Sequence, residues 1–131
     1  MVFQILEAYS NFDTFGHLDY VVRYGPNQNR DYTYQKYQEI LDEILRTLIR
    51  KDIGLEINTG GYKYGLGTPN PCKDVIARYR ELGGKIITFG SDAHDPVYLG
   101  YEMERAASLA KACGFRSYFI FRNRKPIEIP L

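Results

Sequence analysis

The sequence predicts an α/β protein whose strands are mainly parallel. Two long segments, 33–54 and 70–84, repeat apolar side chains at helical spacing. Segments 53–61 and 85–92 are instead short and strand-like. In 53–61 apolar residues alternate with small or polar ones, and 85–92 is a continuous apolar run that ends in polar residues. Strands that alternate with helices of this length are typical of βα units, in which successive strands pair in parallel through a helical crossover.

The first three elements follow from local patterns. A helix is predicted over 3–11 and a strand over 14–21. The helix over 33–54 is amphipathic and stops near Gly54. Its apolar stripe consists of Tyr34, Tyr37, Leu41, Ile44, Leu45 and Leu48.

The strand over 53–61 has two different faces, since Ile53, Leu55 and Ile57 alternate with Gly54, Glu56 and Asn58. In a closed barrel the apolar set would pack outward on the helices, and the polar set would point inward. The strand over 85–92 offers Asp92 to the same interior, so we expect Glu56 and Asp92 to share it.

The remaining elements complete the series. Asn70 is placed as the N-cap of the helix over 70–84, with Pro71 at the first helical position. A third helix is predicted over 99–114, and two short closing strands over 116–121 and 126–129. The two long connections, 24–32 and 60–71, both follow strands, where α/β folds build their sites.

The composition indicates one ordinary globular domain and excludes several partners. The chain has 131 residues, of which 44% are hydrophobic and 25% charged, with a formal net charge of +1. Basic and acidic residues are interleaved, so no nucleic-acid partner is expected. No apolar run approaches the ~20 residues of a membrane span, and no signal peptide is evident, so we expect a cytoplasmic protein without a membrane partner.

Both histidines stand two residues from an aspartate at the end of a predicted strand. His17 is followed by Asp19, and Asp92 is followed by His94 in the stretch FGSDAHD. Spacing of two would put each pair on one side of an extended segment, where nitrogen and oxygen ligands could share an ion. For a single motif, a polar turn with an aspartate cap is the alternative; the occurrence of both motifs favours a metal site.

Three stretches resemble the polymerase and histidinol phosphatase (PHP) family, most closely its histidinol-phosphatase branch. They are FDTFGHLDYVVRYGP, GLEINTGG and IITFGSDAHDPVYLG, and the resemblance extends over nearly the whole chain. It implies a metal-dependent phosphoesterase that acts on a small phosphorylated metabolite, namely histidinol phosphate in histidine biosynthesis. It also implies His17, Asp92 and His94 as ligands of divalent ions (zinc, manganese or iron), and Arg23 as a residue that binds the substrate phosphate.

The family has a distorted (βα)7 barrel, similar to a TIM barrel, and this chain matches only part of it. The family's early H-x-H motif, its next histidine and its acidic bridging ligand have no counterpart here. A complete barrel needs roughly 250 residues. We therefore expect residues 1–131 to be the carboxy-terminal half of the barrel, starting at Met1. Alone it should be inactive, and its partner would be the missing half or a second copy in a homodimer or domain swap.

Other residues keep two interpretations each. Asp19 could hold His17 from outside the metal site, or be a solvated turn residue. Glu56 and Asn58 could pack in the interior or touch substrate. Lys63 could approach an anion or remain solvated, and Ser91 adjoins the motif without an assigned role. Asp92 and His94 are the candidate catalytic residues, and either His94 or an adjacent aspartate could pass a proton to the leaving oxygen.

Two alternative functions remain. A PHP-like domain could bind metal in a non-catalytic or polymerase-associated role. An α/β interaction module could bind no metal at all. Metal analysis distinguishes the interaction module, which would bind no metal, from the other two functions. A phosphatase assay of the full-length gene product distinguishes the enzyme from the non-catalytic PHP-like domain.

Overall fold

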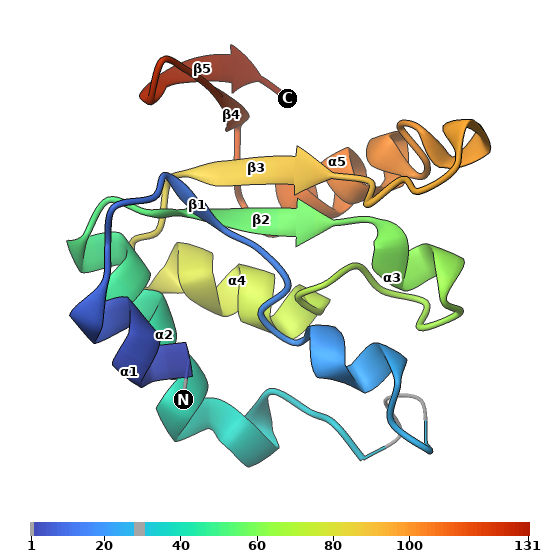
Figure 1. Ribbon diagram of the computed structural model, residues 1–131, viewed down its shortest axis with the longest axis horizontal. Coiled ribbons are helices and arrows are strands. Elements are labelled where there is room, and N and C mark those ends of the chain that lie inside the picture. Colours follow the sequence, from blue (N-terminus) through green and yellow to red (C-terminus); the bar gives the residue numbers. More distant parts are fainter. Residues whose placement is uncertain (1, 28–30) are drawn as a thin grey trace.

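The computed structural model describes residues 2–27 and 31–131 and confirms the α/β architecture (Figure 1). Three parallel strands lie in the order β1-β2-β3. Their bounds are Thr14–Phe15, Gly54–Asn58 and Ile87–Gly90. Leu55, at the centre of the sheet, lies opposite Phe15 on one side and Ile87 on the other. Met1 and residues 28–30, which belong to the predicted connection 24–32, lie outside the described residues.

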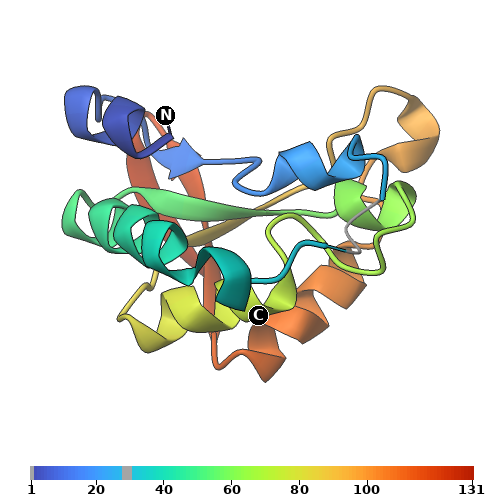
Figure 2. The ribbon, with the colours of Figure 1, turned by 90° about the horizontal axis from the view of Figure 1, so that it is seen from below.

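Helices pack on one side of this sheet, as Figures 1 and 2 show from two directions. The helices are α1 (Val2–Ala8), α2 (Gln38–Arg50), α4 (Lys73–Glu81) and α5 (Met103–Ala112). Leu55 and Ile57 of β2 are fully buried against α2 and α4, as the alternating pattern predicts. The apolar face of β2 therefore points to the helices, and its polar face is left for the site.

The last two strands form a separate antiparallel hairpin, β4 (Ser117–Arg122) with β5 (Lys125–Pro130). In Figure 1 the hairpin lies on the opposite side of the sheet from α2 and α4. The Tyr118 ring lies 5.3 Å from that of Phe89 in β3, and Arg124 at the hairpin turn binds Asp13 ahead of β1. The parallel arrangement thus applies to the first three strands only.

The predicted strand over 14–21 is wrong beyond Phe15. His17 has a left-handed backbone with φ of 61°, which ends the extended segment. Residues Tyr20–Arg23 then form a 3₁₀ helix, η1, two residues after Leu18. This turn carries Arg23 back toward the strand ends.

The predicted cap of α4 is also wrong. The helix begins at Lys73, Cys72 takes the N-cap position, and Asn70 and Pro71 lie before it. The Asn70 side chain binds Arg23 and Asp19 instead of the helix. The connection that precedes α4 contains one helical turn, α3 (Gly60–Lys63). Two further 3₁₀ turns are η2 (Gln35–Tyr37) and η3 (Pro96–Tyr98).

Across the described part of the chain, we find no helix with the length and apolar character that crossing a bilayer requires.

Candidate functional site

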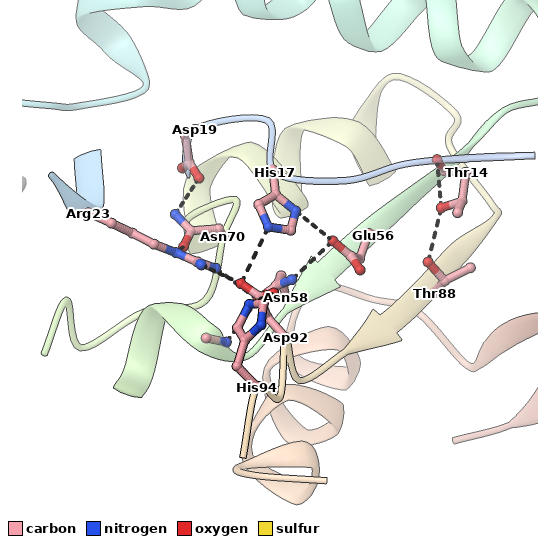
Figure 3. Close-up of polar contacts among 12 residues, drawn as sticks. Thr14, His17, Asp19, Arg23, Glu56, Asn58, Asn70, Thr88, Asp92 and His94 are labelled. Carbon is pink, nitrogen blue, oxygen red and sulfur yellow. Dashed lines mark hydrogen bonds and ion pairs between the residues drawn. The ribbon is translucent and has the colours of Figure 1, made fainter. Parts of the chain in front are cut away.

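Side chains from all three parallel strands meet at the polar face and carboxyl end of the sheet (Figure 3). His17 follows β1, Glu56 belongs to β2, and Asp92 follows β3. The two imidazole nitrogens of His17 contact one carboxylate each: Nδ1 lies 3.4 Å from Glu56 Oε2, and Nε2 lies 3.4 Å from Asp92 Oδ2. Glu56 and Asp92 therefore lie on the same face of the sheet, as the strand pattern predicts, and His17 lies between them.

Asp92 also contacts the second histidine. His94 Nε2 lies 3.3 Å from Asp92 Oδ1, the oxygen that His17 does not contact. The His94 side chain is 80% exposed, so it stands at the surface of the cluster. The structure thus brings His17, Asp92 and His94 to one place, with the carboxylate between the two imidazoles.

The local backbone at this place is unusual. His17 and Asp92 both have positive φ, 61° and 53°, although neither is glycine. Such conformations cost of order 1–3 kcal/mol each and persist where the surrounding structure imposes them, often at functional sites. Both turns occur directly where the chain leaves the sheet, and they direct the two side chains toward each other.

Two glycines make room for the Glu56 carboxylate. A Cβ atom at Gly16 would lie 2.5 Å from Glu56 Oε2, and one at Gly90 would overlap Oε1. The carboxylate therefore occupies a slot between β1 and β3 that larger residues would close. This slot holds Glu56 beside His17.

Arg23 lies beneath this cluster with its side chain fully buried. Its guanidinium donates to Asn70 Oδ1 at 2.7 Å, to Asn58 Oδ1 at 2.8 Å and to Asp92 Oδ2 at 2.7 Å. The hydrogen bond from Arg23 is the main cause that lowers the pKa of Asp92 below its ordinary value, against the opposing effect of burial. Asp92 is therefore an anion at neutral pH.

The aromatic rings of Tyr20 and Tyr64 cover the guanidinium of Arg23, with centroids 5.1 and 5.2 Å from its central carbon. Cation–π contacts of this kind favour the charged group in a site from which water is excluded. The charge of Arg23 therefore contacts two ring faces in addition to its three hydrogen-bond acceptors.

The residue types fit a divalent metal. Imidazole nitrogens and carboxylate oxygens are ligands of zinc, and tetrahedral ligands at about 2.1 Å from an ion lie about 3.4 Å from one another. The His17–Asp92 and His94–Asp92 separations have this size. Over residues 2–27 and 31–131, however, no group of three or more His, Cys, Asp or Glu side chains is assembled as a metal site. Each histidine thus lies at a ligand-to-ligand distance from Asp92, while Oδ2 of Asp92 also accepts a hydrogen bond from Arg23.

Asp19 does not hold His17. Its carboxylate is buried and accepts hydrogen bonds from Asn70 Nδ2 at 2.7 Å and from the Cys72 amide, at the start of α4, at 2.8 Å. The extended segment on which the expectation rested is absent, because the chain turns at His17. Burial raises the pKa of Asp19, and the hydrogen bond from Asn70 opposes that shift. Glu56 takes the position next to His17 Nδ1.

The other candidates lie at the edges of the cluster. Asn58 is 1% exposed and binds Arg23, so it belongs to the interior. The ammonium group of Lys63 lies 4.0 Å from the centroid of the Tyr98 ring. Ser91 Oγ accepts a hydrogen bond from the Gly100 amide at 3.4 Å and so closes the loop after β3. Sequence reasoning missed Asn70, whose position before Pro71 and a helix is also typical of an N-cap.

Comparison with protein-family models gives no match. Among curated proteins, the histidinol-phosphatase of Lactococcus lactis is 36% identical over 121 residues, which is 92% of this chain and 45% of that protein. Probable histidinol-phosphatases of Clostridium acetobutylicum and Thermotoga maritima are 30% and 32% identical, and the match covers 44% and 48% of their lengths. The chain thus spans about half the length of the curated relatives it matches.

A solved structure has a similar fold. The histidinol phosphate phosphatase of Lactococcus lactis, complexed with zinc, L-histidinol and phosphate, matches with a TM-score of 0.74 and 32% sequence identity. The match covers 96% of this chain and 48% of that one. Sequence and structure therefore point to the same relatives and to the same half-length correspondence.

Proposed function

We propose that this chain, which belongs with the histidinol phosphatases and spans about half of their length, is the carboxy-terminal portion of a metal-dependent phosphoesterase that hydrolyses histidinol phosphate. The solved relative, complexed with zinc, L-histidinol and phosphate, supports both the substrate and the metal. The polymerase-associated alternative has no relative of that description among these matches.

In this proposal His17, Asp92 and His94 hold a divalent ion, with zinc favoured over manganese or iron by the relative's content. Asp92 suits the role because its pKa is lowered, so its carboxylate needs no deprotonation before it binds a cation. Glu56 holds His17 through Nδ1, which leaves Nε2 facing Asp92 and free to coordinate. Once bound, the ion would polarise the phosphoryl group and lower the pKa of water near it.

The chain's own residues supply fixed charge at the site. Arg23 contributes a fixed positive charge beside Asp92, and three of its five N–H donors are used by the protein. The remaining two would meet phosphate oxygens as charge develops on them, which requires Tyr20 or Tyr64 to move because the Arg23 side chain is 0% exposed. His94 would hold the ion through Nε2, so that nitrogen cannot also donate a proton, and water at the exposed edge of the cluster would protonate the leaving alkoxide.

The proposal also includes the architecture. The three parallel strands and their helices would form part of a distorted (βα)7 barrel, closed by an amino-terminal half that carries the other metal ligands. A half-barrel exposes unpaired strand edges, which favour association with that half or with a second copy of this chain. Three ligands are also too few for a cluster of two or three ions.

The observation that carries the proposal is the position of Asp92 between two imidazole nitrogens and a buried arginine at the ends of parallel strands. The test measures phosphate release from L-histidinol phosphate with zinc present. It compares this chain alone with a fusion that joins it to the amino-terminal half of the Lactococcus lactis relative. We expect no turnover by the chain alone and zinc-dependent turnover by the fusion, abolished by Asp92→Asn.

The controls separate the parts of the proposal. A Glu81→Gln fusion should keep its activity, because Glu81 is an exposed residue of α4 whose carboxylate pairs with Arg78, away from the cluster. Zinc-dependent turnover by the 131 residues alone would contradict the need for a second half. A folded fusion that binds zinc but releases no phosphate would contradict the phosphatase assignment. Sedimentation of the chain alone tests its association, and a monomer at all concentrations would refute it.

A further inference from the structure

Two buried asparagines hold the guanidinium of Arg23 from one side. Asn70 Oδ1 accepts from Arg23 Nε at 2.7 Å, and Asn58 Oδ1 accepts from Nη2 at 2.8 Å. The two asparagines are 0% and 1% exposed. They present two amide oxygens to two adjacent nitrogens of the guanidinium, where a carboxylate would usually present its two oxygens.

The backbone fixes the spacing of these two oxygens. The Asn58 amide donates to the Asn70 carbonyl at 2.7 Å, and the Asn70 amide donates to the Asn58 carbonyl at 2.9 Å. This isolated antiparallel bridge joins the end of β2 to the segment before α4. At Gly60 a Cβ atom would lie 2.8 Å from both Asn58 Oδ1 and Arg23 Nη2, so only glycine permits the close approach.

The orientation of each amide is set by its other contacts. Asn70 Nδ2 donates to Asp19 Oδ1, which can only accept while it is ionised, so Asn70 Oδ1 must face Arg23. Asn58 Oδ1 also accepts from the Gly60 amide, and Asn58 Nδ2 donates to Glu56 Oε2 at 3.2 Å. Turning the Asn70 amide over would break two hydrogen bonds, turning the Asn58 amide over would break three, and either change would pair like groups.

The third nitrogen of the guanidinium, Nη1, connects Arg23 to the histidine cluster through Asp92. Arg23 Nη1 donates to Asp92 Oδ2, the oxygen that His17 Nε2 also approaches. Because the asparagines are uncharged, they orient Arg23 without neutralising it. The direction of the Asp92 carboxylate therefore depends on a chain of contacts that begins at Asp19 and the start of α4.

We propose that Asn58 and Asn70 form a neutral two-oxygen clamp, oriented by Asp19, that positions Arg23 and thereby directs Asp92 toward the two histidines. They are positioning residues, since neither contacts His17 or His94. The effect on a bound metal rests on the proposed function, while the clamp itself is a property of the chain without metal.

The test uses the 131-residue chain with three changes. Asn70→Asp places a second carboxylate against Asp19, so the two repel and the side chain at position 70 is displaced from its fixed place beside Arg23. The double variant Asp19→Asn, Asn70→Asp reverses the direction of the hydrogen bond between residues 19 and 70 and restores every contact. Its total charge equals that of the unchanged chain. Asp42→Asn is the matched control, because Asp42 is another buried carboxylate bound to an arginine, Arg78, on the helical side of the sheet.

Two readouts are taken at neutral pH. The first is solvent exchange of the Arg23 Nε proton, followed by NMR without metal; the second is zinc affinity by calorimetry. For Asn70→Asp we expect exchange at least tenfold faster and zinc affinity about tenfold weaker, the size typical for residues that orient ligands. The double variant should return both values toward those of the unchanged chain. Asp42→Asn should lower the melting temperature and leave both values unchanged.

The outcomes are distinguishable. Unchanged exchange in Asn70→Asp, or fast exchange in a folded double variant, would overturn the clamp. The same holds if Asp42→Asn accelerates exchange as much as Asn70→Asp does, because the effect would then be general loosening. If the unchanged chain binds no zinc while exchange follows the expected pattern, the clamp stands and the proposed metal site fails.

Discussion

Replacing Arg23 with methionine should destabilise the chain far more than an ordinary arginine substitution does. Methionine keeps the apolar stem of the side chain and removes the guanidinium. The change deletes three charge-assisted hydrogen bonds of 2.7–2.8 Å and leaves Asn58, Asn70 and Asp92 without that partner. No water replaces it easily, since the Arg23 side chain is 0% exposed.

The magnitude follows from opposing contributions. Hydrogen bonds to charged groups contribute about 1.5–3 kcal/mol each. The unfolded chain solvates the guanidinium, which offsets several kcal/mol of that sum. Removing one partner of a buried ion pair costs about 3–5 kcal/mol. Asp92 is 21% exposed and can regain some water, so we expect about 3 kcal/mol.

The assay is urea unfolding followed by circular dichroism, with Arg46→Met as the control. The Arg46 side chain is 57% exposed and lies 3.4 Å from Asp42, so its loss should cost about 1 kcal/mol or less. A cost for Arg23→Met no larger than that of the control would refute the buried network.

The pH dependence gives a second check. Asp92 has a lowered pKa, so the contribution of its pair with Arg23 is present above the unfolded pKa and lost as pH falls. The difference between Arg23→Met and the unchanged chain should therefore shrink in acid.

Three further predictions concern other parts of the molecule. Gly90→Ala should displace the Glu56 carboxylate and weaken zinc binding about tenfold by calorimetry, and unchanged affinity would show that the slot is not needed. The hydrogen bond from Arg78 lowers the pKa of Asp42 below its ordinary 3.8. The pair should therefore stabilise the fold above pH 3.8, and this stabilisation should be lost as pH falls through the lowered pKa. Urea titrations between pH 7 and 3 should show this loss in the unchanged chain and less of it in Asp42→Asn, and identical profiles would contradict it. Burial raises the pKa of Cys72 to about 11, so the folded chain should react slowly with a disulfide reagent at pH 8 and rapidly in urea; fast reaction of both cysteines in the folded chain would count against this.

Periodic segments of the sequence predict their structure well. The stripe on α2 and the alternation in β2 report burial directly, because an apolar face must be covered. Leu45, Leu48, Leu55 and Ile57 are all buried as expected, whereas Tyr37, which the predicted stripe includes, is 43% exposed and lies in η2, before α2 begins. The same alternation places Glu56 on the face that Asp92 shares, and the structure confirms that both carboxylates contact His17.

Prediction failed where the conformation of a single residue decides the path of the chain. The pattern around His17 is compatible with a strand, but its left-handed backbone ends β1 and begins a turn. That turn separates His17 from Asp19, which binds Asn70 and the start of α4 instead. No local signal distinguishes an asparagine that caps a helix from one that binds an arginine 47 residues away.

The sequence by itself determined the alternation of helices and strands, the buried face of the sheet, and the residue types at the strand ends, because periodic burial and motif chemistry are local properties. Only the tertiary structure decided which of those polar groups meet. The Asn58–Asn70 bridge, the burial of Arg23 and the position of Asp92 between two imidazoles all join residues far apart in the chain. A buried polar group must satisfy its hydrogen bonds with whichever groups the fold brings within reach, and that choice is made by packing rather than by neighbouring sequence.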